Sequence, residues 1–562
     1  MRKNHYFNPG SGVMILIAIA LIVSACGSGS GKEQAPIVRD TTITAQNAYN
    51  NLFFDSLRLE KAIASDSSLW QFDEKLRRFY AGRNYQFAWF DTSGMAEQAY
   101  NFRNLWTASA SDLQDSLLLN EPLTATVDSL HQPGLTPPSS DSGIFRTEIA
   151  LTRQFFLYAE KNFTGKENLD MAELEWFIPR KKIQAVELLD SLIATKGKDI
   201  ARIAPVSKQY YLLEEYLKKY YQLEKETGWP EIVAEQKKFS PGDSSSTISA
   251  IKHRLSFLGD YADPDSSGYF NNALTEAVKN YQHRHGITED GIIGPQFLRR
   301  LNAPINDRIR QILINMERLR WAPREPETDY LLVNIPEYRL HVYEDGQLSF
   351  DMDVVVGKAQ HGTVIFTGSL KYIVFSPYWN IPPGILANEI LPAVQRNPGY
   401  LAKHNMEVVS GKTVVPPGSI NWGKYTARTF PYMIRQKPGD NNSLGRVKFL
   451  FPNNYNIYFH DTPAKSLFGE SRRDFSHGCI RLSEPVKFAE HLLRNDTSWT
   501  SEKISEFMKA DKEKYVTLKK EIPVFIGYFT AWVDKDGKLN FREDVYGHDK
   551  KLEEKLFGSS PK

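Results

Sequence analysis

The chain of 562 residues contains only two cysteines, Cys26 and Cys479. It also lacks an excess of charge of either sign, because 69 lysines and arginines stand against 67 aspartates and glutamates, for a formal net charge of +2. A nucleic-acid-binding domain normally carries a basic patch or stripe, and no such block is present, so we expect no nucleic acid partner. Low-complexity tracts and internal repeats are absent as well. At about 150 residues per domain, the length allows roughly three to four globular domains.

A long hydrophobic run is missing too. The most apolar segment, residues 13–25, is shorter than the about 20 residues that a transmembrane helix needs, and it follows Arg2 and Lys3. It predicts a signal peptide over residues 1–25. Its end, VSAC, resembles the lipobox of bacterial lipoproteins, in which the cysteine, here Cys26, becomes the acylated first residue. An ordinary cleaved signal peptide with an incidental cysteine is the alternative to the lipobox. Residues 26–46, with the run GSGSGKEQ, predict a flexible tether.

With Cys26 bound to lipid, Cys479 has no partner for a disulfide within the chain. Export places the protein in an oxidising compartment, where thiols usually pair. An unpaired cysteine in an exported protein is either an intermolecular bridge or a free reactive thiol. Cys479 is therefore the first candidate for chemistry.

Helical periodicity dominates residues 47–240, which predict a helical domain. In KQYYLLEEYLKKYYQLEKE, the residues Tyr210, Leu213, Leu217 and Tyr220 follow the spacing of one helix face. We interpret this stripe as core; a sugar-binding platform is the alternative. The breaks HQPGLTPPSSDSG and KFSPGDSSS carry the proline, glycine and serine that mark loops and linkers.

Residues 247–302 predict three short helices. The first two have apolar stripes, and EDGIIG supplies a turn before the third. The predicted stripes are Ile248, Ile251, Leu255 and Leu258, and then Ala273, Ala277, Val278 and Tyr281. The run AVKNYQHRHGITEDGIIG resembles the peptidoglycan-binding domain found beside many cell-wall enzymes. A helical spacer that binds nothing is the alternative.

The periodicity changes from helical to alternating at Asp329. The segment YLLVNIPEYRLHVYEDGQLSFDMDVVVG places Asp345-Gly346 between two strand-like runs, which is a strong hairpin signal. Further strand-like runs follow, so residues 327–534 predict a mostly-β domain. Residues 383–430 are rich in loops and short helical pieces and predict an insertion, and residues 535–562 predict a C-terminal strand and tail.

The surroundings of Cys479 decide whether its thiol reacts. A thiol of ordinary pKa, about 8.5, is only a few per cent thiolate at neutral pH, so a nucleophilic cysteine needs a nearby imidazole or a positive pocket. Spacing alone does not choose between His460 and His477. Glycine at 478 allows a carbonyl oxygen to approach the N–H groups of Gly478 and Cys479, as in an oxyanion hole. A buried structural cysteine and a metal site of two histidines and one cysteine are the alternatives.

Residue patterns beyond the cysteine point to one family. His460, fifteen further residues and then Ser476-His477-Gly478-Cys479-x-Arg481 resemble the signature of the L,D-transpeptidase catalytic domain. The runs FSPYWNIPPGI, IRQKPGDNNSLGRVKFLFPN, HDTPAKSLF and FYAGRNYQFAWFD resemble the large subclass of that family. The resemblance implies a multidomain α+β protein, with a helical N-terminal scaffold, a three-helix peptidoglycan-binding domain and a mostly-β catalytic domain with a capping insertion.

The resemblance also implies roles for individual residues. Cys479 is the expected nucleophile and His460 the expected general base, oriented by the backbone carbonyl of Asp461. His477 and Gly478 are expected at the oxyanion side. The expected substrate-binding residues are Arg481, Ser476, Tyr378 and Trp379. Core packing is the alternative for Tyr378 and Trp379, and a structural ion pair is the alternative for Arg481.

The implied activity is acyl transfer between peptidoglycan stem peptides. The thiolate attacks the third residue of a tetrapeptide donor, expels the terminal D-alanine and leaves a thioester, which the side-chain amine of an acceptor stem converts to a 3→3 cross-link. No cofactor and no metal are expected. Water or a protein lysine as acceptor gives the alternatives of an L,D-carboxypeptidase or a wall-attachment enzyme; an inactive wall-binding lipoprotein is a further one.

The expected location is the periplasm, with the protein anchored by lipid to the cell envelope. Gly27 follows the lipidated cysteine instead of the aspartate associated with inner-membrane retention, which favours the outer membrane. Expected partners are the tetrapeptide stems, the membrane and other cell-wall synthases. Carbapenems are expected to acylate Cys479, as the family resemblance implies.

Overall fold

The computed structural model describes residues 36–558, except for residues 45, 49, 131–140, 167, 199–203 and 263–264. The predicted signal peptide, the lipidation site at Cys26 and the first part of the predicted tether lie outside the described residues. In this part of the chain, no helix has both the length and the hydropathy that a membrane crossing requires.

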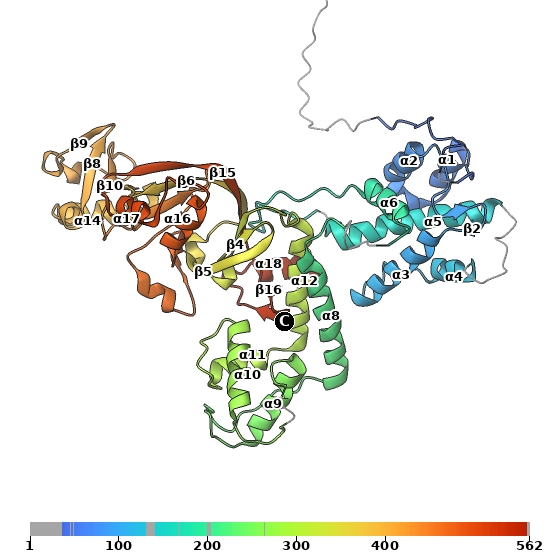
Figure 1. The fold of residues 1–562 in the computed structure, drawn as a ribbon, viewed down its shortest axis with the longest axis horizontal. Coiled ribbons are helices and arrows are strands. Elements are labelled where there is room, and N and C mark those ends of the chain that lie inside the picture. The colour runs from blue at the N-terminus through green and yellow to red at the C-terminus, as the bar shows by residue number, and fades with distance from the viewer. Residues whose placement is uncertain are drawn as a thin grey trace, which may run out of the picture.

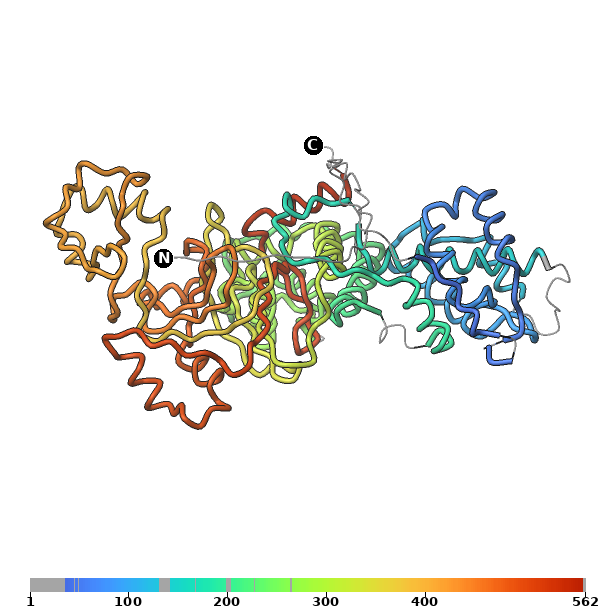
Figure 2. Tube along the Cα trace, turned by 90° about the horizontal axis from the view of Figure 1, so that it is seen from above, coloured from blue at the N-terminus to red at the C-terminus, as the bar shows by residue number. Residues whose placement is uncertain are grey.

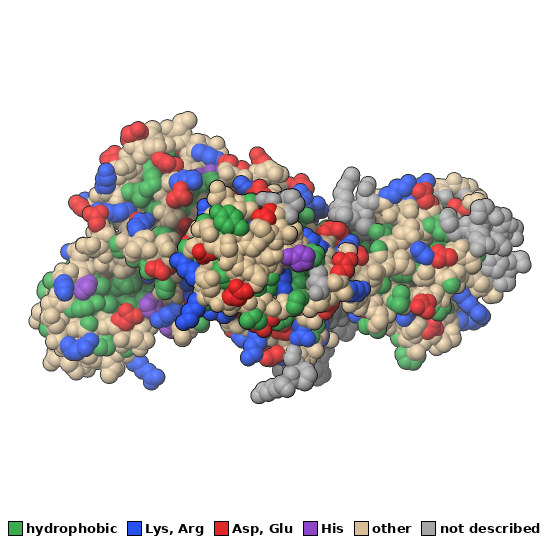
Figure 3. All heavy atoms as spheres, turned by 90° about the horizontal axis from the view of Figure 1, so that it is seen from below, with side chains coloured by type: hydrophobic (Ala, Val, Ile, Leu, Met, Phe, Trp, Pro, Cys, Tyr) green, Lys and Arg blue, Asp and Glu red, His purple; other side chains and the backbone are tan. Residues whose placement is uncertain are grey.

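The described chain forms an elongated molecule with a helical N-terminal unit at one end and a β-rich region at the other (Figures 1 and 2). Between them, helices α8 (Lys208–Thr227) and α12 (Ile305–Trp321) pack side by side (Figure 1). A small helical domain lies below this pair in the view of Figure 1. Acidic and basic side chains are interspersed over the face drawn in Figure 3, in keeping with the small net charge.

The helical unit is built around a buried carboxylate. Glu148 is fully buried and accepts hydrogen bonds from the backbone N–H groups of Ala88 (2.7 Å) and Trp89 (3.0 Å) and from the hydroxyl of Tyr80 (2.9 Å). Since a buried polar group needs such partners, these hydrogen bonds connect the run 79–91 to the helix that carries Glu148. The unit contains α1 (Ser56–Ser65), α2 (Asp73–Gly82), β1 (Phe90–Asp91), β2 (Gly94–Met95), α3 (Glu97–Asp112), α4 (Glu121–Leu130), α5 (Asp141–Ala159) and α6 (Ala185–Ala194).

The stripe on α8 is core, as predicted. Tyr210, Leu213, Leu217 and Tyr220 are all buried and belong to the cluster that also contains the apolar residues of α12. A sugar-binding platform is therefore excluded for these side chains.

The small helical domain has the three predicted helices, α9 (Ser246–Leu258), α10 (Asn272–Arg284) and α11 (Pro295–Leu301). Most of the predicted stripes are buried, but Ala273 is exposed and Leu274 takes its place in the core, because the buried face of α10 is turned by one residue. The side chain of Gln282 closes the turn before α11, since it donates to Asp290 (2.7 Å) and accepts from the N–H of Gly291 (2.9 Å).

The β-rich region is a nine-stranded sheet in the order β13-β5-β14-β12-β11-β6-β15-β3-β4. Because β4 also pairs with β5, the sheet closes on itself as a barrel. The predicted hairpin is present, and Asp345 and Gly346 have φ values of 47° and 72°, as a type I′ turn requires. The strands are β3 (Tyr330–Asn334), β4 (Arg339–Glu344), β5 (Gln347–Gly357), β6 (Phe366–Phe375), β11 (Val447–Leu450), β12 (Phe459–His460), β13 (Asp474–Ser476), β14 (Ile480–Leu482) and β15 (Lys514–Gly527). Helices α16 (Pro485–Leu493) and α17 (Ser501–Lys509) contribute to the same core.

The insertion forms a unit with its own sheet and core, which we call the cap. Its four strands lie in the order β7-β10-β8-β9. Since β7 and β10 flank the predicted range 383–430, the structural unit is longer than that range at both ends. The elements are β7 (Trp379–Asn380), α13 (Pro383–Ile385), α14 (Leu391–Arg396), α15 (Tyr400–Lys403), β8 (Met406–Ser410), β9 (Thr413–Val415) and β10 (Met433–Gln436).

The strand predicted in the C-terminal segment is present as β17 (Leu539–Phe541), but much of the predicted tail is a helix. The segment contains a hairpin of β16 (Ala531–Val533) and β17, followed by helix α18 (His548–Phe557), which packs against α12. The prediction missed α18 because its buried face offers a single large apolar residue, Leu552, beside the polar His548 and Asp549. A sequence pattern that depends on apolar spacing does not detect such a face.

Candidate active site around Cys479

Two short parallel strands bring the predicted nucleophile and base together. Strand β12 ends at His460 and pairs in parallel with β14, so that Phe459 lies opposite Ile480 and His460 opposite Arg481. The N–H of Ile480 donates to the carbonyl of Tyr458 (3.1 Å). Cys479 directly precedes β14 and is therefore held beside the start of β12 by the backbone ladder of the barrel.

His460 is a neutral imidazole with a defined tautomer. It is buried, and its Nδ1 lies 2.5 Å from the carbonyl oxygen of Asp461. Because a carbonyl only accepts, Nδ1 carries the proton and Nε2 keeps its lone pair. Burial lowers the pKa of His460 to about 3, with a further lowering by the positive charge of Arg481. The ring is thus uncharged at neutral pH, and its Nε2 lone pair carries no proton.

Asp461 holds this backbone corner in place with its side chain. Its carboxylate accepts from the N–H groups of Arg446 (2.8 Å) and Thr462 (2.7 Å) and pairs with the ammonium of Lys465 (2.6 Å). The carbonyl that contacts His460 therefore belongs to a residue whose side chain is held by Arg446, Thr462 and Lys465.

The thiol of Cys479 is partly exposed and lies near polar groups of β12 and the turn before it. Its Sγ lies 3.6 Å from the carbonyl oxygen of Asn456. Burial raises the pKa of Cys479, whereas the N–H and hydroxyl of Tyr458 and the charge of Arg481 act in the opposite direction. The thiol and the imidazole are therefore both neutral at neutral pH.

Hydrogen bonds from Ser476 shape the loop that carries the cysteine. Gly478 has a φ of +112°, a conformation that favours glycine. Its N–H donates to the Ser476 hydroxyl (3.1 Å), which in turn donates to the carbonyl of Cys479 (2.6 Å). We expected the N–H groups of both Gly478 and Cys479 to face a carbonyl oxygen, but the first is already bonded. Within the described part of the chain, the N–H of Cys479 has no hydrogen-bond partner and is the free donor.

Three parts of the chain match models of known families. Residues 328–504 match the family model of the L,D-transpeptidase catalytic domain. These residues are therefore similar to an L,D-transpeptidase catalytic domain. Residues 74–217 match a model described as "Scaffold domain", and residues 244–301 match one described as "Putative peptidoglycan binding domain".

Individual relatives carry the same name. A Haemophilus influenzae protein named "Putative L,D-transpeptidase" is 33% identical over 247 residues, which are 43% of this chain and 49% of the relative. The chain thus matches about half of the length of that curated relative. Among solved structures, an L,D-transpeptidase from Stackebrandtia nassauensis is 15% identical over 53% of this chain and 98% of its own, with a TM-score of 0.22. One from Xylanimonas cellulosilytica is 14% identical over 52% of this chain and 100% of its own, with a TM-score of 0.17.

The other predicted site residues make contacts of different kinds. The ring of His477 stacks on His361, and its Nε2 lies 3.2 Å from the carboxylate of Glu389 in the cap. His477 therefore connects the loop that carries Cys479 with the cap.

The described residues contain no group of three histidine, cysteine or acidic side chains arranged to hold a metal. His460, His477 and Cys479 therefore do not form a metal site there.

Arg481 faces the site from β14. Its Nε is buried without a hydrogen-bond partner, and among the described residues no carboxylate forms an ion pair with it. The alternative of a structural ion pair is thus wrong for the described chain. A buried polar atom without a partner is costly, and an incoming polar group can satisfy it.

Tyr378 and Trp379 lie where the barrel meets the cap. The ring of Tyr378 lies under the guanidinium of Arg435, 4.1 Å from its centroid, and Trp379 packs against the cap core. These contacts agree with the alternative of packing at the junction.

Sequence reasoning missed Tyr458, whose hydroxyl faces the sulfur and whose own pKa is raised by burial and by the neighbouring thiol. The register of β12 contained the signal, since Tyr458 and His460 are two residues apart and lie on the same face of a strand.

Proposed function

We propose that the protein is a peptidoglycan L,D-transpeptidase that forms 3→3 cross-links through a thioester on Cys479. The observation that carries the proposal is the neutral imidazole of His460, with Nδ1 bound to the Asp461 carbonyl, on the strand beside the cysteine. Nε2 of this ring has a free lone pair. A cysteine whose raised pKa keeps it protonated needs such a base to become a nucleophile.

In the proposed first step, His460 Nε2 takes the thiol proton while Sγ bonds to the carbonyl carbon of the third stem residue. The negative oxygen that develops is held by the free N–H of Cys479, and the charge of Arg481 lowers the energy of the thiolate. The bond from carbon to the D-alanine nitrogen then breaks, and His460 returns the proton to this amine. The product is a thioester and free D-alanine.

In the second step, the side-chain amine of an acceptor stem attacks the thioester. His460 takes a proton from the amine, the new amide bond forms, the carbon–sulfur bond breaks and the thiolate is protonated again. Atoms and charges balance without a cofactor. The same intermediate with water or a protein lysine as acceptor gives carboxypeptidase or attachment activity.

The remaining expectations belong to the same proposal. The helical scaffold of residues 47–240 and the peptidoglycan-binding domain of residues 247–302 hold the catalytic domain at the wall. Cys26 is the lipid anchor that keeps the protein in the periplasm at the envelope, with the outer membrane preferred. Ser476, Gly478 and His477 shape the oxyanion side, and other cell-wall synthases are the proposed partners.

Mass analysis of muropeptides tests the proposal. Incubation of peptidoglycan with the protein is expected to produce 3→3 dimers and release D-alanine, and the Cys479→Ala variant is expected to produce neither. Tripeptides without dimers would identify a carboxypeptidase. An unchanged muropeptide profile with the native protein would contradict the proposal.

A further inference from the structure

The loop between β5 and β6 contacts the loop that carries Cys479 and holds the peptide bond between Gly478 and Cys479. Thr363, in the loop between β5 and β6, is buried, and its hydroxyl donates to the carbonyl of Gly478 (2.8 Å) while it accepts from the N–H of Gly357 (2.9 Å). The Gly478 carbonyl and the Cys479 N–H belong to one planar peptide unit and point in opposite directions. Whatever fixes the carbonyl therefore also aims the free N–H of Cys479.

Tyr546 holds Thr363 from a distant part of the sequence. Its hydroxyl accepts from the N–H of Thr363 (3.2 Å) and donates to the carbonyl of Gly357. Its ring also lies against Gly362, where an added Cβ would be 3.3 Å away. The tyrosine thus closes the 358–363 loop at both of its ends with one hydroxyl group.

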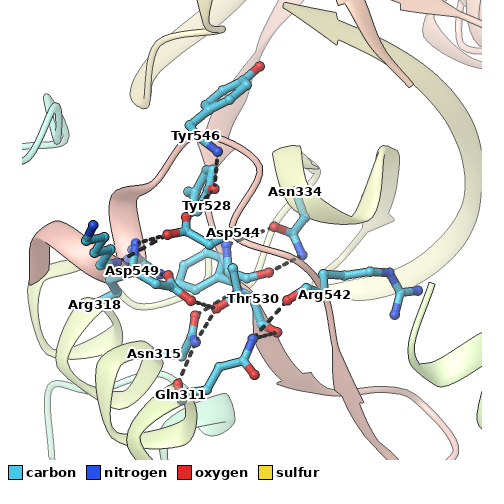
Figure 4. A network of polar contacts seen from close by, with 12 residues as sticks. Gln311, Asn315, Arg318, Asn334, Tyr528, Thr530, Arg542, Asp544, Tyr546 and Asp549 are labelled. Carbon is cyan, nitrogen blue, oxygen red and sulfur yellow. Dashed lines mark hydrogen bonds and ion pairs between the residues drawn. The ribbon is translucent and has the colours of Figure 1, made fainter. Parts of the chain in front are cut away.

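Tyr546 itself is tied to α12 through the network drawn in Figure 4. Its N–H donates to the hydroxyl of Tyr528 (2.9 Å), which donates to Asp544 (2.7 Å). The second oxygen of Asp544 accepts from the N–H of Asp549 (3.0 Å), and the carboxylate of Asp549 pairs with Arg318 of α12 (2.5 Å). The position of the Tyr546 hydroxyl is thus determined by the segment between β17 and α18 and by α12.

We propose that Tyr546 is a positioning residue for acyl transfer, which acts through Thr363 and the Gly478–Cys479 peptide to aim the N–H of Cys479 at the acyl oxygen. The inference rests on the proposed function, because the N–H matters only where an oxyanion develops. It does not require Tyr546 to touch the substrate or the thiol.

The first test is Tyr546→Phe, which keeps the ring and removes the hydroxyl. Loss of a whole oxyanion donor costs about 10²–10³-fold in rate, so a donor that is present but misdirected is expected to lower carbapenem acylation of Cys479 by at least about 10-fold. Alkylation by iodoacetamide is expected to stay within about 2-fold of the native rate, because displacement of iodide develops no oxyanion. Tyr515→Phe, at an exposed tyrosine of β15, is the matched control and should change neither rate.

Substitutions of Thr363 test the path. Thr363→Val removes the hydroxyl at nearly constant shape and is expected to reproduce the loss in acylation, whereas Thr363→Ser keeps the hydroxyl and should restore most of the rate. If both residues act through one peptide, the double variant Tyr546→Phe with Thr363→Val loses much less than the product of the two single losses. Multiplicative losses would overturn the path through Thr363.

The two cysteines allow a readout that does not depend on activity. A chain labelled with ¹⁵N at cysteine has two labelled amides, and the signal that persists in Cys26→Ala belongs to Cys479. Tyr546→Phe is expected to shift this signal, and Tyr515→Phe is not. An unshifted signal, native acylation by a folded Tyr546→Phe variant, or equal losses in acylation and alkylation would each overturn the inference. Absence of cross-linking by the native protein would contradict the proposed function alone, since the amide signal still reports on Tyr546.

Discussion

The pH dependence of acylation offers the sharpest check on the role of His460. In the folded protein the pKa of this histidine is about 3 instead of the ordinary 6.5. At 1.36 kcal/mol per pKa unit, the fold disfavours the imidazolium by about 5 kcal/mol. A general-base reaction needs the imidazole neutral and the thiol protonated, so its rate is constant between the pKa of His460 and the raised pKa of Cys479.

The expected result is a plateau in the second-order rate constant of carbapenem acylation, measured by intact-mass spectrometry, from about pH 4.5 to 8. The neutral fraction of a histidine with a pKa of 6.5 falls about 25-fold between pH 7 and pH 5, whereas the neutral fraction of one with a pKa near 3 hardly changes. In His460→Ala only the free thiolate reacts, so the rate should be lower by at least about 10²-fold near neutral pH and rise about tenfold per pH unit.

Two variants provide the controls. His253→Ala changes an exposed histidine of the small helical domain and should leave the plateau intact. Arg481→Gln removes the cation that helps lower the pKa of His460, so the acid limb should move towards neutral pH. An acid limb centred near pH 6.5 in the native protein, or a plateau that survives His460→Ala, would refute the assignment of His460 as the base and the effect of its burial on its pKa.

Three further predictions use other contacts. Tyr458→Phe removes a hydroxyl that lowers the pKa of Cys479, so the rise of iodoacetamide alkylation with pH should move to higher pH; an unchanged profile would contradict a contact between hydroxyl and sulfur. Glu148→Ala leaves the buried N–H groups of Ala88 and Trp89 without an acceptor, which costs about 1–3 kcal/mol of stability for each group. Limited proteolysis should therefore cut the helical unit at a lower temperature than in the native chain. Equal resistance to proteolysis would argue against the buried cluster. Cys26→Ala should abolish partition into detergent, and native protein found without lipid in the aqueous fraction would contradict the lipobox interpretation.

Local patterns predicted the elements whose conformation depends on neighbours in sequence. The Asp345-Gly346 turn and the buried face of α8 follow from glycine conformation and from helical spacing, and both are confirmed. The pair of Cys479 and His460 came from a resemblance, because spacing alone left His460 and His477 equivalent. In the structure the two histidines have different surroundings, since His460 lies on β12, which pairs in parallel with β14, whereas the ring of His477 stacks on His361.

The parts that the sequence did not reveal depend on contacts over long separations. Nothing near Gly478 indicates that its N–H is bonded to Ser476, or that Thr363 holds its carbonyl. The contact of Tyr546 with the 358–363 loop joins segments 183 residues apart along the chain. Helix α18 was missed because its buried face is largely polar and depends on Arg318 of α12 as a partner.

Closure of the barrel has a consequence for local opening. His460 ends β12 and Cys479 directly precedes β14, two inner strands of a sheet in which β4 pairs back to β5, so that neither β12 nor β14 lies at a free edge. To separate Cys479 from His460, the ladder between β12 and β14 must break while β5 and β11 hold these strands in the closed sheet, which requires a large cooperative unit to open. The cap has its own small core and can open separately. Amide hydrogens of β12 and β14 should therefore exchange with solvent far more slowly than those of β8 and β9, so that Cys479 and His460 keep their spacing even where the cap opens.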